Sequence, residues 1–212
     1  MVDYSLYLCT NSEINNNYLL EECVEQAIKG GVSIVQVREK NKSYNDFLKI
    51  ATRIKKITDT YEVPLIINDN IEIAKELNAD GIHIGQNDIS CSQARKIIGD
   101  KKIIGVTVAN IEEAKKAVED GANYLGVGAI FKSITKSDAP VVGIDELKKI
   151  CQFSPIPIVV IGGINKDTIP LLKDIKIDGY AMIRPILSTN DITESSKELR
   201  RLIQNNKKIL NK

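Results

Sequence analysis

Short apolar runs alternate with longer segments of helical periodicity along the whole chain. The runs are rich in Ile, Val and Leu and show little apolar/polar alternation, which is typical of strands buried on both faces. They predict strands at 6–9, 33–37, 65–68, 81–84, 103–106, 124–127, 158–161 and 179–183. The segments between them predict helices at 19–29, 43–60, 71–77, 90–98, 111–119, 145–151, 167–172 and 192–208, with Ser43 and Ser90 as N-caps.

Eight β/α units within 212 residues predict a single-domain (β/α)8 TIM barrel spanning residues 1–212. No linker or low-complexity segment divides the chain. A doubly wound open sheet is the alternative fold. That fold usually carries a GxGxxG turn after its first strand, and no such turn follows residues 6–9.

The composition is that of an ordinary globular protein, with 43% hydrophobic and 27% charged residues and a net charge of +1. This near-neutral charge argues against a nucleic-acid partner. The four cysteines form no CxxC pair, so the sequence predicts neither a zinc site nor a redox motif. No signal peptide or membrane-length apolar run is present, and we expect a cytoplasmic location without membrane contact.

Polar residues gather where the predicted strands end, and in barrels of this kind the chemistry lies at the C-terminal strand ends. In strand order they are Gln36, Arg38, Glu39 and Lys40; Asn68 and Asp69; Gln86, Asn87 and Asp88; Thr107 and Asn110; Lys132, Ser133, Thr135 and Lys136; Gly162, Gly163 and Asn165; and Arg184. Together they predict a site for a polyanionic ligand at one face of the barrel.

Within this set, the carboxylates of Asp69 and Asp88 suit Mg2+, which binds phosphates beside one or two carboxylates. Arg38, Lys40 and Lys136 would neutralise the remaining phosphate charge. The alternative is that these residues are helix caps and solvated rim charges.

Two further features bear on the chemistry. Gly162 and Gly163 let the backbone approach a ligand closely, and barrels often bind phosphate after strands seven and eight; a tight turn is the alternative. His83, the sole histidine, is expected to be a packed core residue. A single histidine makes nucleophilic hydrolase chemistry a poor fit.

Several segments resemble the motifs of the thiamine-phosphate synthase family, in order and over nearly the whole chain. Residues 6–11 resemble LYLVTD, 36–40 resemble QxREK, 65–69 resemble IINDR, 79–88 resemble ADGVHLGQxD, 135–136 match the TK of the loop after strand six, and 161–164 match IGGI. The first four motifs are specific together, whereas IGGI alone is weak.

The resemblance implies a transferase of thiamine biosynthesis. A hydroxymethylpyrimidine diphosphate would lose pyrophosphate, and the nitrogen of thiazole phosphate would take its place, giving thiamine phosphate. Ionisation of the pyrimidine first would demand stabilisation of the leaving group and alignment of the reactants. The implied cofactor is Mg2+, and the implied partners are the two small-molecule substrates.

The same resemblance implies residue roles by position. Mg2+ would be held by Asp69 and Asp88, and the catalytic residues would be Arg38, Lys40, Thr107 and Lys136. Substrate binding would involve Gln36, Val37, Arg38, Glu39, Lys40, Asn68, Thr107, Ser133, Ile134, Thr135, Lys136, Gly163, Ile183 and Arg184. A homodimer is expected only from the habits of barrel enzymes.

The chain departs from the family pattern at several positions. Lys132-Ser133 stands where Pro-Thr is usual, and Arg184-Pro185 where a small Ser-Ala pair is usual. Two other functions stay open. A related thiazole tautomerase would tend to lose the metal carboxylates and to use a histidine where this chain has Ala109. A non-catalytic barrel that senses a phosphorylated thiamine precursor would not need both carboxylates.

Overall fold

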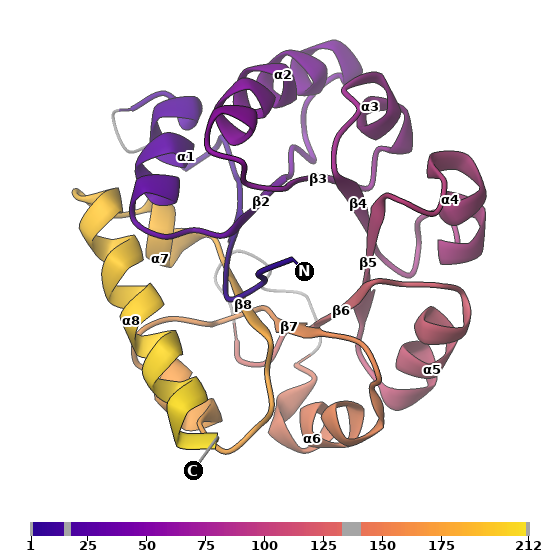
Figure 1. The fold of residues 1–212 in the computed structure, drawn as a ribbon, viewed down its shortest axis with the longest axis vertical. Coiled ribbons are helices and arrows are strands. Elements are labelled where there is room, and N and C mark those ends of the chain that lie inside the picture. The colour runs from indigo at the N-terminus through magenta and orange to yellow at the C-terminus, as the bar shows by residue number, and fades with distance from the viewer. Residues whose placement is uncertain (1, 15–17, 133–140, 211–212) are drawn as a thin grey trace.

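The computed structural model, which describes residues 2–14, 18–132 and 141–210, contains a closed barrel of parallel strands in sequence order (Figure 1). The strands are β1 Leu6–Cys9, β2 Ile34–Val37, β3 Leu65–Asn68, β4 Gly81–Ile84, β5 Ile103–Val108, β6 Tyr124–Val127, β7 Ile158–Val160 and β8 Gly179–Met182. Each strand pairs with the next, and β8 pairs with β1 to close the barrel. The predicted TIM barrel is therefore confirmed.

Helices surround the barrel in Figure 1 and cover its outer surface. They are α1 Leu20–Lys29, α2 Tyr44–Thr60, α3 Ile71–Glu76, α4 Cys91–Ile98, α5 Ile111–Glu119, α6 Gly143–Phe153, the 3-10 helix η1 Ile169–Leu172, α7 Arg184–Leu187 and α8 Ile192–Leu210. The predicted caps are confirmed: Ser43 accepts a hydrogen bond from the Asp46 amide, and Ser90 accepts one from the Gln93 amide.

The structure corrects three elements of the sequence prediction. β5 continues to Val108, so Thr107 lies within the strand and not after it. The segment expected to form a helix at 167–172 is a short 3-10 helix at Ile169–Leu172, because a helix that begins at residue 167 would need the amide that Pro170 lacks. The short helix α7 was not predicted, because four residues are too few to show a period.

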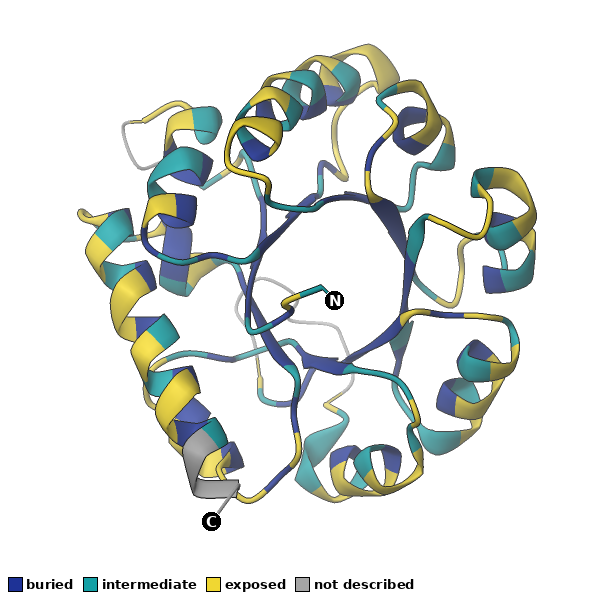
Figure 2. Cartoon of the chain, viewed as in Figure 1, coloured by how far each residue is buried: buried dark blue, intermediate teal, exposed yellow. Residues whose placement is uncertain are grey.

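Two apolar layers result from the alternation of side chains along each strand. Val35 and Val37 of β2 belong to the large outer layer between barrel and helices, whereas Ile34 belongs to a smaller cluster inside the barrel. Figure 2 shows the ring of buried strands and helices that are buried on their inner side. Each fully buried Leu, Ile or Val contributes roughly 1.5–3 kcal/mol to folding.

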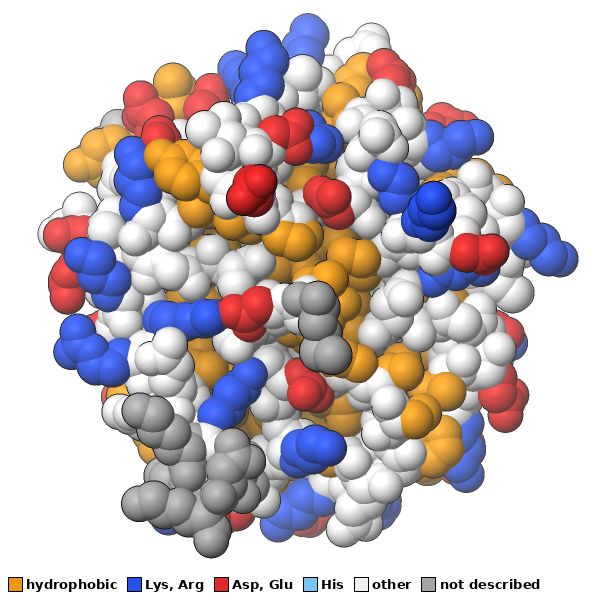
Figure 3. All heavy atoms as spheres, viewed as in Figure 1, with side chains coloured by type: hydrophobic (Ala, Val, Ile, Leu, Met, Phe, Trp, Pro, Cys, Tyr) orange, Lys and Arg blue, Asp and Glu red, His pale blue; other side chains and the backbone are white. Residues whose placement is uncertain are grey.

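The chain's N-terminal segment closes the barrel at the N-terminal ends of the strands, where Figure 1 shows it over the opening. Tyr4 is buried there, with its ring centroid 4.9 Å from that of Tyr124. On this face, Lys and Arg side chains are interspersed with Asp and Glu (Figure 3). None of the described helices is long and apolar enough to cross a bilayer.

Candidate active site

One cation and two carboxylates meet where three neighbouring strands end. Lys40 follows β2, Asp69 follows β3 and Asp88 follows β4, and these strands pair in that order. The Lys40 Nζ forms an ion pair with Asp69 Oδ2. Asp88 lies close enough to Asp69 to raise the pKa of its carboxyl group. The structure thus brings together three of the residues expected to bind metal and diphosphate.

The backbone at Asp69 is held in an uncommon conformation. Its φ is 60°, in the left-handed region that non-glycine residues rarely adopt. The Asp69 amide donates to the His83 carbonyl at 2.8 Å, and Asn68 Nδ2 donates to Asp69 Oδ1 at 2.8 Å. Such a conformation costs on the order of 1–3 kcal/mol and tends to occur at functional sites.

Neither carboxylate serves as a helix cap, so that alternative does not explain them. The N-cap of α3 is Asn70, whose side chain accepts from the Ile73 amide at 2.9 Å, and the N-cap of α4 is Ser90. Asp88 Oδ2 instead accepts from the Gly85 amide at 2.7 Å within the loop after β4. Both acids are therefore placed without a role in starting the helices that follow them.

The electrostatics of this cluster fit a divalent cation. Burial raises the pKa of Asp69; Lys40 lowers it, and the neighbouring Asp88 raises it further. A cation between the two acids would relieve this repulsion. Within the described ranges, no group of three or more His, Cys, Asp or Glu side chains is arranged to hold a metal. Mg2+ needs only one or two carboxylates beside water and substrate phosphates.

Three polar side chains lie inside the barrel near the C-terminal ends of the strands, on the same side as this cluster. Gln36 of β2 is 4% exposed and Asn68 of β3 is 8% exposed, and Asn68 Nδ2 also approaches the His83 carbonyl at 3.4 Å. Thr107 of β5 accepts at its backbone carbonyl from Gln86 Nε2 at 2.6 Å. Polar side chains thus lie near the C-terminal ends of three strands, β2, β3 and β5.

The remaining residues of the second motif lie differently. Val37 is buried in the outer layer, so its side chain faces the helices and only its backbone faces the site. Glu39 is 7% exposed, and its Oε2 accepts from Ser12 Oγ at 2.5 Å; burial raises the pKa of this acid. The Arg38 amide donates to Thr10 Oγ1 at 3.1 Å, and its side chain is half-buried.

The expected thiazole-phosphate residues lie after β6, β7 and β8. Ser133, Ile134, Thr135 and Lys136 fall outside the described residues. Gly163 has a φ of 66°, and a Cβ there would lie 2.6 Å from the Phe131 Cβ and 2.8 Å from the Lys132 carbonyl oxygen. Ile183 precedes α7, and Arg184 is the first residue of α7 and is exposed.

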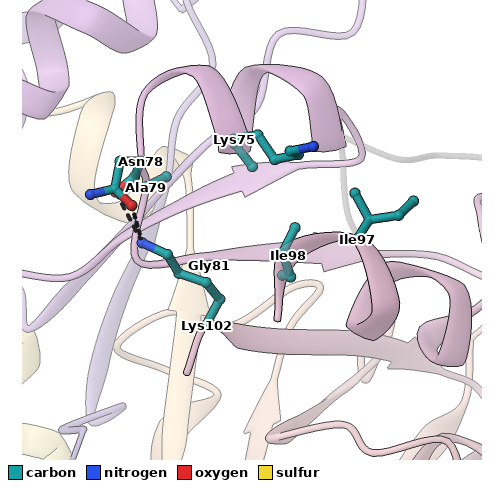
Figure 4. A pocket seen from close by; sticks show the side chains of 8 residues that line it. Lys75, Asn78, Ala79, Gly81, Ile97, Ile98 and Lys102 are labelled. Carbon is teal, nitrogen blue, oxygen red and sulfur yellow. Dashed lines mark hydrogen bonds between the residues drawn. The ribbon is translucent and has the colours of Figure 1, made fainter. Parts of the chain in front are cut away.

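A pocket at the other end of the barrel is unrelated to this cluster. It lies between α3 and α4 near the start of β4, as Figure 4 shows, and Lys102 Nζ donates there to the Asn78 backbone carbonyl and side chain. In these barrels, the N-terminal face serves stability and the C-terminal face serves catalysis. By this rule, we expect the chemistry at the opposite end of the barrel.

Sequence reasoning missed three residues that contact the candidate site. Tyr7 bonds to Gln36, and His83, expected only to be a packed core residue, bonds to Thr107. Tyr124 lies between Tyr7 and His83. A polar side chain at an inward position of a barrel strand is the signal that could have found them.

The fold is a closed (β/α)8 barrel, and a cluster of one cation and two carboxylates lies at the C-terminal ends of its strands, where barrel enzymes place their active sites. Residues 6–186 match the family described as thiamine monophosphate synthase. The thiamine-phosphate synthase of Clostridium tetani is 50% identical over 198 residues, which are 93% of this chain and 95% of that protein. That of Clostridium beijerinckii is 48% identical over 199 residues, 94% of this chain and 95% of that protein.

A solved structure agrees with the sequence relatives. Thiamine phosphate pyrophosphorylase from Pyrococcus furiosus superposes with a TM-score of 0.88 at 31% identity and covers 97% of this chain and 98% of its own. The chain belongs to the thiamine-phosphate synthase family, which confirms the resemblance seen in its motifs. A 3-keto-L-gulonate-6-phosphate decarboxylase from Vibrio cholerae, at 13% identity and a TM-score of 0.72, shares the fold alone.

Proposed function

We propose that this chain is a transferase that joins hydroxymethylpyrimidine diphosphate to thiazole phosphate. The bond between the pyrimidine methylene carbon and the diphosphate oxygen breaks, and a bond from that carbon to the thiazole nitrogen forms. Thiamine phosphate and pyrophosphate leave. Membership of the thiamine-phosphate synthase family, with relatives matched over more than nine-tenths of both chains, supports this reaction.

The observation that supports the mechanism is the cluster of Lys40, Asp69 and Asp88. Neither Asp69 nor Asp88 is the N-cap of a helix. Asp69 and Asp88 would hold Mg2+, which neutralises negative charge on a diphosphate leaving group. Lys40 and Arg38 add positive charge from the loop after β2, and Lys136 adds it from the loop after β6. Charge stabilisation of this kind suits a reaction that needs little proton transfer.

Gln36, Asn68 and Thr107 would orient the pyrimidine diphosphate from the barrel interior. The thiazole phosphate would lie against Ser133, Ile134, Thr135, Gly163, Ile183 and Arg184, with backbone amides of the loops after β7 and β8 facing its oxygens. Holding both substrates in line supplies a large part of the rate enhancement in two-substrate reactions. A cytoplasmic location suits an enzyme with two charged precursors, and a homodimer stays a prediction.

The first experiment measures pyrophosphate release by purified protein with both substrates, with and without Mg2+. Release that needs both substrates and the metal supports the transferase. Retention of thiazole-phosphate binding without release would indicate a binding barrel or a tautomerase instead.

The variant Asp69→Asn tests the metal site. It keeps the side-chain size but removes the charge, and we expect Mg2+-dependent release to fall at least about a hundredfold. The matched control is Asp174→Asn, since Asp174 is exposed in the connection between η1 and β8, away from the cluster. Turnover of Asp69→Asn equal to that of the control would refute the metal assignment.

A further inference from the structure

A chain of hydrogen bonds crosses the barrel interior and joins two of the residues expected to bind the pyrimidine diphosphate. Gln36 Nε2 donates to Tyr7 Oη at 2.8 Å, and Tyr7 Oη lies 2.8 Å from Tyr124 Oη. His83 Nδ1 lies 2.8 Å from Tyr124 Oη, and His83 Nε2 lies 2.8 Å from Thr107 Oγ1. The chain runs through β2, β1, β6, β4 and β5.

The aromatic rings in this series of hydrogen bonds are tightly packed inside the barrel. A Cβ on Gly105 would lie 2.1 Å from the Tyr124 Cζ, and a Cβ on Gly126 would lie 2.8 Å from the His83 Cε1. Tyr7 is 1% exposed, and Tyr124 is completely buried. The two glycines therefore provide the space that the rings fill, and the rings hold the hydroxyl and imidazole groups in place.

The donors and acceptors of this chain fit one direction. Gln36 donates to Tyr7, so the single proton of Tyr7 is directed to Tyr124, and that of Tyr124 to His83 Nδ1. The neutral imidazole then carries its proton on Nε2, and this N–H donates a hydrogen bond to Thr107 Oγ1. Burial raises the pKa of both Tyr7 and Tyr124, which keeps both phenols protonated.

This direction sets the chemical character of both ends. The amide nitrogen of Gln36 is engaged with Tyr7, so its carbonyl oxygen is left to accept from a ligand. Thr107 Oγ1 accepts a hydrogen bond from His83 Nε2, so the hydroxyl proton of Thr107 points elsewhere. The amino group of an aminopyrimidine can donate a hydrogen bond to the Gln36 carbonyl oxygen. The oxygens of a diphosphate can only accept, and the Thr107 hydroxyl can donate to them. If every hydrogen bond in this series were reversed, Gln36 would present a donor and Thr107 an acceptor, and neither would match this ligand.

We propose that Tyr7, Tyr124 and His83 are positioning residues that fix Gln36 as an acceptor and Thr107 as a donor toward the pyrimidine diphosphate. This proposal rests on the proposed transferase function. We call this series of hydrogen bonds, from Gln36 through Tyr7, Tyr124 and His83 to Thr107, the relay. It should affect one substrate only, because Gln36 and Thr107 are both expected to bind the pyrimidine diphosphate. Thiazole phosphate is expected on the loops after β6, β7 and β8, away from these residues.

The variant Tyr124→Phe interrupts the relay and keeps the ring that packs against Gly105. We expect kcat/KM for the pyrimidine diphosphate to fall about tenfold to a hundredfold, with the KM for thiazole phosphate unchanged. The matched control is Tyr180→Phe on β8, whose hydroxyl bonds to Asn206 of α8 outside the barrel. Thermal melting of both variants measures the structural cost, and kinetics are compared well below both melting temperatures.

A double-mutant cycle tests whether Tyr124 acts through Thr107. In a Thr107→Ala background, Tyr124→Phe should lower kcat/KM by clearly less than it does in the wild type, because only the Gln36 end of the relay is left to lose. A loss as large as in the wild type would overturn the proposal. So would a Tyr124→Phe variant that weakens both substrates equally or matches the Tyr180→Phe control.

Calorimetric binding of hydroxymethylpyrimidine diphosphate separates this proposal from the proposed function. Wild-type protein that releases no pyrophosphate refutes the transferase function, and the binding measurement still decides on the relay. Tyr124→Phe should bind this substrate about tenfold more weakly than the wild type. Equal affinities would overturn the relay whether or not the wild type turns over.

Discussion

At the scale of single residues, the structure concentrates charge and strain where β2, β3 and β4 end. Asp69 combines a left-handed backbone, a raised pKa caused first by burial, and an ion pair with the half-exposed Lys40. None of these features is needed to start α3, which is capped by Asn70. A costly backbone conformation that no helix cap requires supports the proposed role of Asp69 in ligand binding.

Lys136 is the residue for which the resemblance predicts a direct effect on the chemical step. We expect Lys136→Ala to lower kcat on the order of a hundredfold or more, because charge on the departing pyrophosphate would lose a partner. The affinity for thiazole phosphate should change by less than about threefold. The control is Lys132→Ala, which removes an exposed lysine at the start of the same loop. Equal, modest effects on kcat and affinity would indicate a plain binding role.

The charged residues of the candidate site at the ends of β2, β3 and β4 could be predicted from the sequence because each lies within four residues of the end of an apolar run. Asp69 and Asp88 needed only the position of a strand end and the rule that barrel chemistry lies there. The relay could not be predicted in this way. Tyr7, His83 and Tyr124 come from strands that are not neighbours in sequence, and their contacts depend on the closed barrel and on space left by Gly105 and Gly126.

At the scale of elements, long apolar runs and clear caps predicted most strands and helices to within a residue or two. The failures have local causes. The four-residue α7 is too short to show a period, and Pro170 lacks the amide that a helix beginning at residue 167 would need. The boundary of β5 was placed too early because Thr107 is polar, although barrel strands carry polar side chains inward near their C-terminal ends.

The contact between the loops after β6 and β7 gives a prediction at this scale. Gly163→Ala would place a methyl group against Phe131 and the Lys132 carbonyl, directly before Ser133. We expect the KM for thiazole phosphate to rise about tenfold and the KM for the pyrimidine diphosphate to stay nearly constant, because the distortion falls on one substrate's loops. Steady-state kinetics with each substrate varied in turn measure both values.

A second glycine separates this effect from backbone strain alone. Gly99 ends α4 with a φ of 81°, and a Cβ there would meet nothing within 4 Å. Gly99→Ala should therefore cost on the order of 1–3 kcal/mol of stability, because its φ of 81° and ψ of 171° lie in a region that glycine alone readily adopts, without changing either KM. A rise in the thiazole-phosphate KM in both variants would show that global destabilisation is responsible.

At the scale of the whole molecule, the last helix, α8, contacts the residues beside β1 and β8, the two strands whose pairing closes the barrel. Arg200 of α8 forms an ion pair with Asp3 at 2.5 Å and approaches Ser33 Oγ at 3.5 Å. Lys207 of α8 donates to the Asp178 carbonyl at 2.6 Å, just before β8. Both ends of the chain therefore contact the seam where β8 pairs with β1.

The ion pair between Asp3 and Arg200 makes this closure sensitive to pH. Burial alone would raise the pKa of Asp3, but hydrogen bonds from Arg200 and Ser5 outweigh it and lower the pKa from 3.8 to about 2. A lowered pKa in the folded state means that the stabilisation is present above the ordinary value and is lost as the pH falls toward 2. Since the Asp3 side chain is 47% exposed, solvent screening reduces its contribution to roughly 1 kcal/mol.

The variant Arg200→Met keeps most of the side chain's apolar length and removes its charge, so it tests this linkage. We expect the free energy of unfolding, from urea titrations, to lie about 1 kcal/mol below that of the wild type at neutral pH. The gap should narrow as the pH falls from about 4 toward 2, because Asp3 then becomes protonated in both proteins. Arg201→Met, on the exposed side of α8, should show no gap at any pH. A gap for Arg200→Met that stays constant down to pH of about 3 would mean that Arg200 stabilises the seam by packing against Gly31 and not through its charge.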